Sequence, residues 1–166
     1  MPYITIKNKD FKSSVKLADI LYVKTKEDLL KIANRLDYWI SPNVTKAKIA
    51  QRLAASILDE PLEVVSRLSK TELLLLEELI EAGPDKYVEK KMRKTPYMLQ
   101  KWGLVLTYED EENGKWHLLM PDEVRTALNE YAPAYITLAK EGKQCPSAKE
   151  VRMRAALASL FGNSKE

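Results

Sequence analysis

The chain has little of the side chains on which most metal and nucleophilic chemistry depends, because its 166 residues include one cysteine and one histidine. Cys145 alone cannot form an intrachain disulfide, and with His117 it cannot complete a four-ligand zinc site of the usual cysteine and histidine kind. A cysteine nucleophile normally needs a base beside it, and the surrounding EGKQCPS is typical of a loop. These shortages favour a binding protein over an enzyme, and we expect no cofactor and no metal.

The sequence also lacks glycine clusters and long apolar runs. Its five glycines stand apart, which excludes a glycine-rich phosphate loop. No segment approaches the ~18 consecutive apolar residues that cross a bilayer, and the opening MPYITIKNKDFKSS has no apolar stretch of the secretory kind. We therefore expect a cytoplasmic protein that does not contact a membrane.

Charged residues are plentiful at 31%, but the two signs nearly balance and the net charge is +3. Their distribution is uneven. Residues 1–60 carry 11 basic and 7 acidic side chains, residues 61–85 carry 2 and 6, and residues 86–101 carry 6 and 1. Two basic blocks thus flank an acidic one, an arrangement that allows a polyanionic partner without requiring it.

Apolar residues make up 45% of the chain, and their spacing predicts a mostly α-helical fold. After a weakly alternating segment at residues 2–7 that predicts a short strand, Thr25 is a typical N-cap for a helix ending near Leu36. Residues 37–44 break the pattern as an extended connector, and Thr45 caps a second helix. One face of these helices carries the apolar residues Leu29, Ile32, Ala33 and Leu36, then Ile49, Leu53 and Ile57.

The middle of the chain contains a strong helix start at Ser69-Lys70-Thr71-Glu72, which reads as a capping box. The helix that follows is apolar over a wide arc and ends at Gly83-Pro84. We expect a short helix from Asp85 to about Arg93. Another should follow the N-cap and first-turn proline of Thr95-Pro96 and end at Trp102-Gly103.

Strands are expected at residues 104–108 and 115–119, joined through Asn113-Gly114, a strong hairpin-turn dipeptide. Helices should follow from Pro121 and from Ser147. We therefore divide the chain into an N-terminal helical hairpin at residues 1–60, a second unit at 61–131 and a C-terminal helical extension at 132–166.

The second unit resembles a winged helix-turn-helix domain. Residues 69–120, about a third of the chain, follow its order of helix, helix, short helix and two-stranded wing, and Leu99–Val105 (LQKWGLV) is similar to the junction before the wing. The resemblance implies that the helix before the wing enters the DNA major groove. Its outer face would then carry Tyr97, Gln100 and Lys101, where a glutamine can pair with adenine and a lysine can reach guanine or phosphate.

Basic residues just before that helix are expected to hold phosphates, and these are Lys86, Lys90, Lys91, Arg93 and Lys94. Solvated lysines on an exposed helix are an equally ordinary interpretation. The wing itself carries Glu109-Asp110-Glu111-Glu112, which would repel a phosphate backbone. Many winged helices are protein-docking modules, and an acidic wing suits that role.

The first unit resembles the SAP-like helix–extended loop–helix, which is also found at the start of Rho-type termination factors. The resemblance rests on KEDLLKIANRL at residues 26–36 and TKAKIAQRL at residues 45–53. It implies non-specific DNA or RNA binding, although the related LEM type binds protein. The expected phosphate contacts, two i, i+4 pairs and one residue at a helix start, are Lys31, Arg35, Lys48, Arg52 and Lys46.

The connector departs from the SAP-like pattern, because Tyr38 and Trp39 stand where small residues are usual. The two aromatics either stack on bases or fill the gap between the helices. The leading hypothesis is a non-catalytic nucleic-acid-binding accessory protein, with DNA the favoured ligand and weak sequence preference. The alternative is a protein–protein interaction adaptor that uses the same two units as docking surfaces.

Overall fold

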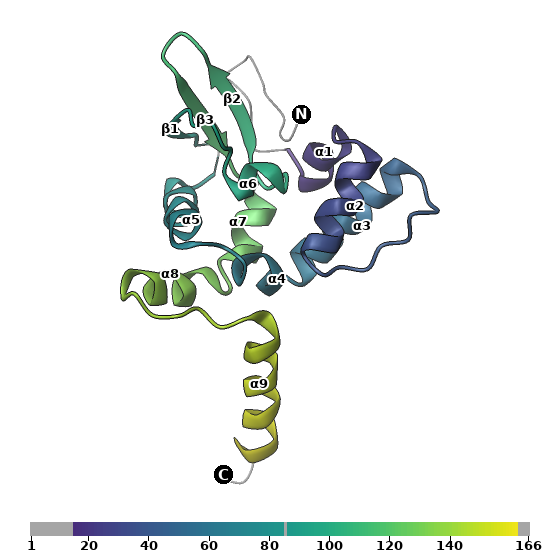
Figure 1. Ribbon diagram of the computed structural model, residues 1–166, viewed down its shortest axis with the longest axis vertical. Helices are drawn as coiled ribbons and strands as arrows, with labels where there is room; N and C mark the ends of the chain where they lie inside the picture. The colour runs from purple at the N-terminus through teal and green to yellow at the C-terminus, as the bar shows by residue number, and fades with distance from the viewer. Residues whose placement is uncertain (1–14, 85, 163–166) are drawn as a thin grey trace.

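The computed structural model describes residues 15–84 and 86–162, so the strand expected at residues 2–7 lies outside the described residues. Within the described part the protein is mostly α-helical, as predicted, with a three-stranded antiparallel sheet (Figure 1). None of the helices described is both long enough and apolar enough to cross a membrane.

The N-terminal helices are α1 (Leu17–Tyr22), α2 (Lys26–Arg35) and α3 (Lys46–Asp59). The two N-caps expected here are confirmed. The Thr25 hydroxyl accepts a hydrogen bond from the Asp28 amide at 3.1 Å, and Thr45 accepts one from the Lys48 amide at 3.3 Å. These bonds satisfy amides that a helix start leaves without a partner.

The connector between α2 and α3 is free of regular structure, as predicted. Its two aromatic residues lie in different environments, one buried and one exposed. Tyr38 is buried, and its hydroxyl donates to the Glu60 carbonyl at 2.6 Å. Trp39 is 87% exposed. Tyr38 therefore fills the gap inside the hairpin, whereas only Trp39 remains available for contact with a partner.

The second unit begins with α4 (Leu62–Val65) and α5 (Lys70–Ala82). Ser69 caps α5 as predicted, because its hydroxyl accepts from the Glu72 amide at 3.3 Å. The helices α7 (Asp122–Leu128) and α8 (Ala132–Lys140) follow the sheet, and α8 packs against α5.

The sheet consists of β1 (Val88–Lys91), β2 (Leu106–Asp110) and β3 (Lys115–Leu119), in the order β1-β3-β2. The predicted β2–β3 hairpin is confirmed, with Leu106 opposite Leu119 and Asp110 opposite Lys115. Its turn ends at Gly114, whose φ of 62° is the left-handed conformation that glycine favours.

The prediction of a short helix from Asp85 to Arg93 is wrong, because residues 88–91 form the edge strand β1. Val88 pairs with Leu118, and Lys91 pairs with Lys115. The pairing decides the conformation here, since β structure depends on cross-strand neighbours more than on local preference. Lysines on an edge strand also hinder pairing with a further chain, which is a structural reason for part of this basic block.

The helix before the hairpin is shorter than predicted. It is α6 (Met98–Lys101), and its N-cap is Tyr97 instead of Thr95. Four residues make a single turn, so α6 presents little surface of its own.

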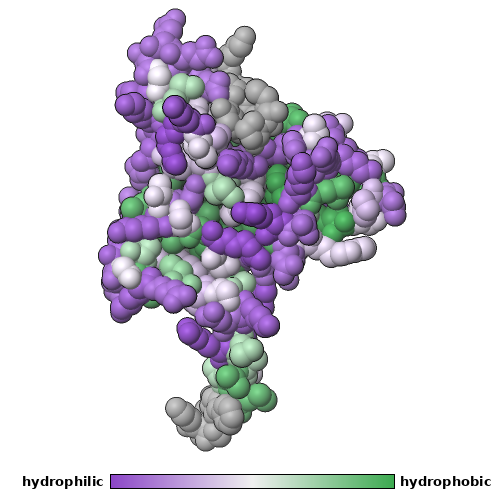
Figure 2. All heavy atoms as spheres, in the orientation of Figure 1, coloured by the Kyte–Doolittle hydropathy of each residue, from purple (hydrophilic) through white to green (hydrophobic). Residues whose placement is uncertain are grey.

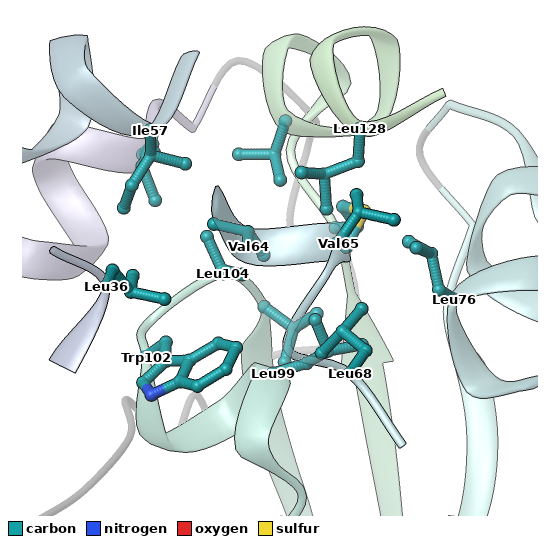
Figure 3. Close-up of a cluster of buried hydrophobic side chains, with 14 of the residues drawn as sticks. Leu36, Ile57, Val64, Val65, Leu68, Leu76, Leu99, Trp102, Leu104 and Leu128 are labelled. Carbon is teal, nitrogen blue, oxygen red and sulfur yellow. The ribbon is translucent and has the colours of Figure 1, made fainter. Parts of the chain in front are cut away.

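A continuous core joins the first unit to the second. Figure 3 shows Leu36 and Ile57 of the hairpin beside Val64 of α4, Leu104 and Trp102. The same cluster of buried residues extends from α1 to the start of α9 (Ala148–Gly162). The expected division at residue 60 therefore falls within one packed core.

Beyond its first turn, α9 extends away from the rest of the molecule (Figure 1). Arg152 bonds to the buried Glu63 of α4, which attaches the helix to the body. Figure 2 shows apolar side chains on the part that projects. Three of them, at i, i+4 and i+7, are largely exposed: Met153 at 56%, Leu157 at 49% and Leu160 at 73%.

Candidate nucleic-acid interface

Two of the residues expected to read bases are not at the surface. Gln100 is fully buried and Tyr97 is 8% exposed. The Gln100 side chain accepts from the Tyr97 amide at 2.8 Å and donates to the Thr107 hydroxyl at 3.2 Å. The expectation that these two residues share the outer face of the helix is therefore wrong, because Gln100 uses its amide to close the start of α6 and to join α6 to β2.

The start of α6 is also closed by a carboxylate. Glu72 of α5 accepts a hydrogen bond from the Met98 amide at 2.6 Å. Burial raises the pKa of the Glu72 carboxyl, although the Met98 and Leu99 amides and the nearby Arg93 and Lys101 oppose the rise. The amides that begin this helix thus have partners within the protein, so α6 does not offer them to a phosphate.

The upstream basic residues are arranged by β1 and the loop after it. Lys90 is half-buried and forms an ion pair with Glu78 of α5. Arg93 is exposed and lies over the Tyr97 ring, 4.2 Å from its centre. Lys91 and Lys94 are also exposed. Structural roles therefore account for Lys90 and Arg93, whereas Lys91 and Lys94 are free to face solvent.

The basic residues of the hairpin lie at the surface as expected. Lys31, Arg35, Lys48 and Arg52 are exposed, and Lys46 is half-buried with its ammonium 4.6 Å from the centre of the Tyr22 ring. Within residues 15–84 and 86–162 none of them forms an ion pair with an acid of residues 59–85. Three of those acids, Glu63, Glu77 and Glu78, pair instead with Arg67, Lys90, Lys140 and Arg152.

A groove of about 650 Å³ runs between α2 and α6. The two helices lie side by side in Figure 1, and Figure 2 shows apolar surface flanked by hydrophilic side chains in that area. Three of the sequence-predicted residues meet there, Lys31 and Arg35 from α2 and Lys101 from α6. The remaining lining residues are Lys24, Asp28, Ile32, Asn34, Met98 and Trp102.

The helical period explains why α2 presents this set. Asp28, Lys31, Ile32 and Arg35 stand at i, i+3, i+4 and i+7, which is one face of a helix. Lys31 forms an ion pair with Glu27 at 3.1 Å, but both side chains are more than 70% exposed. Such a pair contributes little, about 0–1 kcal/mol, so it does not hold Lys31 away from an incoming phosphate.

Lys24 adds a fourth cation, from the turn between α1 and α2. Its side chain is buried. Burial lowers the pKa of the Lys24 amine to about 8, against the opposing effect of the Asp28 carboxylate. A partner's negative charge in the groove would favour the charged amine.

Lys48, Arg52 and Lys46 of α3 do not line the groove, nor do the basic residues of β1. Sequence reasoning did not place Lys24, Met98 or Trp102 at a binding surface. It placed Ile32 on the apolar face of its helix, and Ile32 does belong to the core, although it also lines the groove. The i, i+3, i+4, i+7 pattern in α2 was a signal for one side of the groove, but nothing local indicated that α6 would form the other.

Among the described residues, no group of three or more histidine, cysteine or acidic side chains could hold a metal ion. The four acidic residues expected in the wing divide between a strand and a turn. Glu109 and Asp110 belong to β2, while Glu111 and Glu112 are exposed in the turn.

No family model, curated protein or solved structure matched the chain in comparisons with known proteins. A function for this protein is therefore inferred from the chemistry of the groove.

Proposed function

We propose that this protein binds nucleic acid, chiefly through the phosphate backbone and with weak sequence preference, and that it catalyses no reaction. One observation carries the proposal. Lys31 and Arg35 come from one basic block of the sequence and Lys101 from another, yet all three line the same groove together with Lys24. The three lining cations that keep some exposure, Lys31, Arg35 and Lys101, outnumber the one lining carboxylate, Asp28, and this positive local charge suits a polyanion.

The backbone-dominated character follows from what α6 lacks. With Gln100 and Tyr97 buried, Lys101 is the one member of the predicted reading face that retains some exposure. Lysine and arginine contacts to phosphates position a protein without reading sequence. Affinity should therefore vary little between sequences and strongly with salt.

The proposal includes a winged-helix origin for residues 69–120. The strand order β1-β3-β2 and the β2–β3 hairpin support it. The protein departs from the family's order of helix, helix, short helix and wing, because the single turn of α6 is the one helix between β1 and β2. In this protein the groove beside α2 would then replace the recognition helix as the binding surface.

A protein–protein adaptor is the second candidate, and a different observation favours it. The exposed stripe of Met153, Leu157 and Leu160 projects on α9, and exposed apolar patches mark surfaces that bind other proteins. The acidic turn at Glu111 and Glu112 also suits a protein partner. An adaptor function does not require the cationic groove. Substitutions of Lys31 and Arg35 in the groove therefore distinguish the two candidate functions.

The test is a titration of labelled duplex and single-stranded 20-mers of random sequence, followed by fluorescence anisotropy between about 50 and 300 mM salt. For duplex, the affinity should fall with salt at a log–log slope near −0.9 per neutralised phosphate, or −0.7 for a single strand. The double variant Lys31→Ala with Arg35→Ala should bind all sequences more weakly and reduce the duplex slope by about 2. Lys48→Ala with Arg52→Ala then measures whether α3 contributes as well.

A matched control is available on α9. Lys149→Ala with Arg154→Ala removes the same net charge from exposed positions away from the groove, so its affinity and slope should stay close to those of the unaltered chain. Absence of binding at about 50 mM salt, where backbone contacts are strong, would overturn the proposal. Equal losses in the α2 and α9 variants would show general attraction instead of a site.

A further inference from the structure

The groove between α2 and α6 has two kinds of lining, and phosphate binding uses only one of them. Lysines and an arginine from α2, α6 and the α1–α2 turn supply the charge. Ile32, Met98 and Trp102 add an apolar surface. Ile32 is 7% exposed and Trp102 is 4% exposed, while Met98 is half-buried, so these side chains form a firm lining held by the core.

We propose that this groove takes one unstacked nucleotide of a single-stranded nucleic acid, with the base against Ile32, Met98 and Trp102 and the neighbouring phosphates on Lys31, Arg35 and Lys101. The inference rests on the proposed function and names the form of nucleic acid that this site binds. A volume of about 650 Å³ lies within the range of about 300–1,000 Å³ typical of pockets for small organic ligands.

The apolar lining argues against a duplex as the ligand. In a duplex the bases are stacked inside and the surface offered to a concave site is sugar and phosphate. Such a ligand would satisfy the cations but would make no contact that uses the apolar part of the lining. A single strand can turn a base out of its stack, and base contacts with aromatic and apolar side chains are the usual feature of single-strand sites.

The polar residues of the lining argue against a simple anion. Asp28 and Asn34 lie in the groove together with the cations. A carboxylate repels a phosphate that fills the groove, but it accepts hydrogen bonds from the amino groups of a base, and an asparagine amide both donates and accepts. The lining therefore suits a neutral base inside the groove, with the phosphates held by the long basic side chains around it.

The experiment compares three 12-mers of equal charge per strand at about 150 mM salt: a mixed-sequence single strand, the blunt duplex that it forms, and a strand of abasic units. The full chain carrying Trp39→Phe is used. This change removes the exposed tryptophan, so that fluorescence reports on Trp102 in the groove and on the buried Trp116. The mixed single strand should bind about tenfold more tightly than the abasic strand or the duplex, and only the strand with bases should change the fluorescence at saturation.

A substitution in the lining separates base contact from charge. Met98→Ala should weaken single-strand binding several-fold, leave abasic-strand and duplex binding unchanged, and keep the salt slope. Met153→Ala, the same change on the exposed face of α9, is the matched control and should alter none of these. Thermal unfolding of both variants checks that each remains folded.

The outcomes are distinct. Equal affinity for all three ligands, with no effect of Met98→Ala, would overturn the single-nucleotide inference and leave backbone binding intact. Absence of binding to every ligand even at about 50 mM salt would overturn the proposed function as well. A free nucleoside monophosphate should bind far more weakly than the strand, because it lacks the flanking phosphates; equal affinity would overturn the strand as the occupant.

Discussion

At the scale of single residues, two buried carboxylates join elements that are distant in the sequence. Glu72 of α5 holds the start of α6, and Glu63 of α4 bonds to Arg67 beside it and to Arg152 of α9. Their pKa values are displaced in opposite directions. Burial dominates at Glu72, whereas paired guanidinium groups outweigh burial at Glu63.

We expect Glu72→Gln to be at least as stable as the unaltered chain at pH 7. The amide oxygen still accepts from the Met98 amide, and the cost of burying a charge disappears. Because the folded pKa of Glu72 is raised, this cost is present above the folded pKa and vanishes as the pH falls to the unfolded value of about 4.3. The advantage of Glu72→Gln in denaturant unfolding should therefore shrink between pH 7 and pH 4.

Glu72→Leu is the matching variant without an acceptor. It leaves the Met98 amide buried and unpaired, which costs about 1–3 kcal/mol. Equal stability of the Leu and Gln variants would contradict the assigned role of the Glu72 oxygen.

Glu63→Gln should lower stability by about 1–2 kcal/mol at pH 7, in line with the loss of charge-assisted hydrogen bonds. Burial alone would raise the pKa of the Glu63 carboxyl, but the hydrogen bonds from Arg67 and Arg152 bring it below its usual value. A lowered pKa stabilises the fold above the unfolded pKa of about 4.3, and this stabilisation is lost as the pH falls through the folded pKa. The difference between Glu63→Gln and the unaltered chain, measured by thermal unfolding, should therefore close below about pH 4; a difference that persists there would refute the ionic role.

At the scale of elements, the contact between the N-terminal helical hairpin and the end of α6 depends on Gly103. Its φ of 74° is left-handed, and a Cβ added there would lie 2.7 Å from Leu21 Cδ2 and 2.9 Å from Lys24 Cε. The absence of a side chain thus lets the end of α6 approach the α1–α2 turn, which is the approach that forms the groove.

Gly103→Ala should destabilise the protein by about 2–5 kcal/mol. The left-handed backbone costs an alanine about 1–2 kcal/mol, and crowding in a packed core typically adds about 1–3 kcal/mol. Gly142→Ala is a matched control, because Gly142 has a φ of 70° and no atom within 4 Å of an added Cβ. Gly142→Ala should show the backbone cost alone in denaturant unfolding. Equal losses of stability at both positions would mean that crowding adds no cost at Gly103, which would contradict the close approach of α6 to the α1–α2 turn.

At the scale of the whole molecule, the groove and the acidic turn lie at different places. Figure 1 shows the β2–β3 turn at the end of the hairpin away from α6. A ligand bound between α2 and α6 would not contact Glu111 and Glu112, whereas a duplex bound along the β2–β3 hairpin would pass close to both.

We expect Glu111→Gln with Glu112→Gln to change nucleic-acid affinity less than about threefold at 150 mM salt, where the Debye length is about 8 Å. The measurement is the same anisotropy titration, with Lys31→Ala and Arg35→Ala as the variant that must respond. An increase of tenfold or more would place the nucleic acid along the wing and move the binding surface away from the groove.

Features that arise within a few residues could be predicted from the amino-acid sequence. Thr25, Thr45 and Ser69 cap helices because each hydroxyl reaches an amide three residues on, and Asn113-Gly114 turns a hairpin because glycine accepts positive φ. The mostly α-helical character and the exposed i, i+4 cations of α2 follow from the same local periodicity.

The other features depend on contacts between elements that are distant in the sequence. Residues 88–91 are a strand because β3 lies beside them, and Gln100 is buried because the Tyr97 amide and Thr107 need its side chain. The groove exists because Gly103 allows α6 against the α1–α2 turn, which brings Lys101 to the same cavity as Lys31 and Arg35. The chemistry of this site comes from residues about 70 positions apart, so no local pattern could contain it.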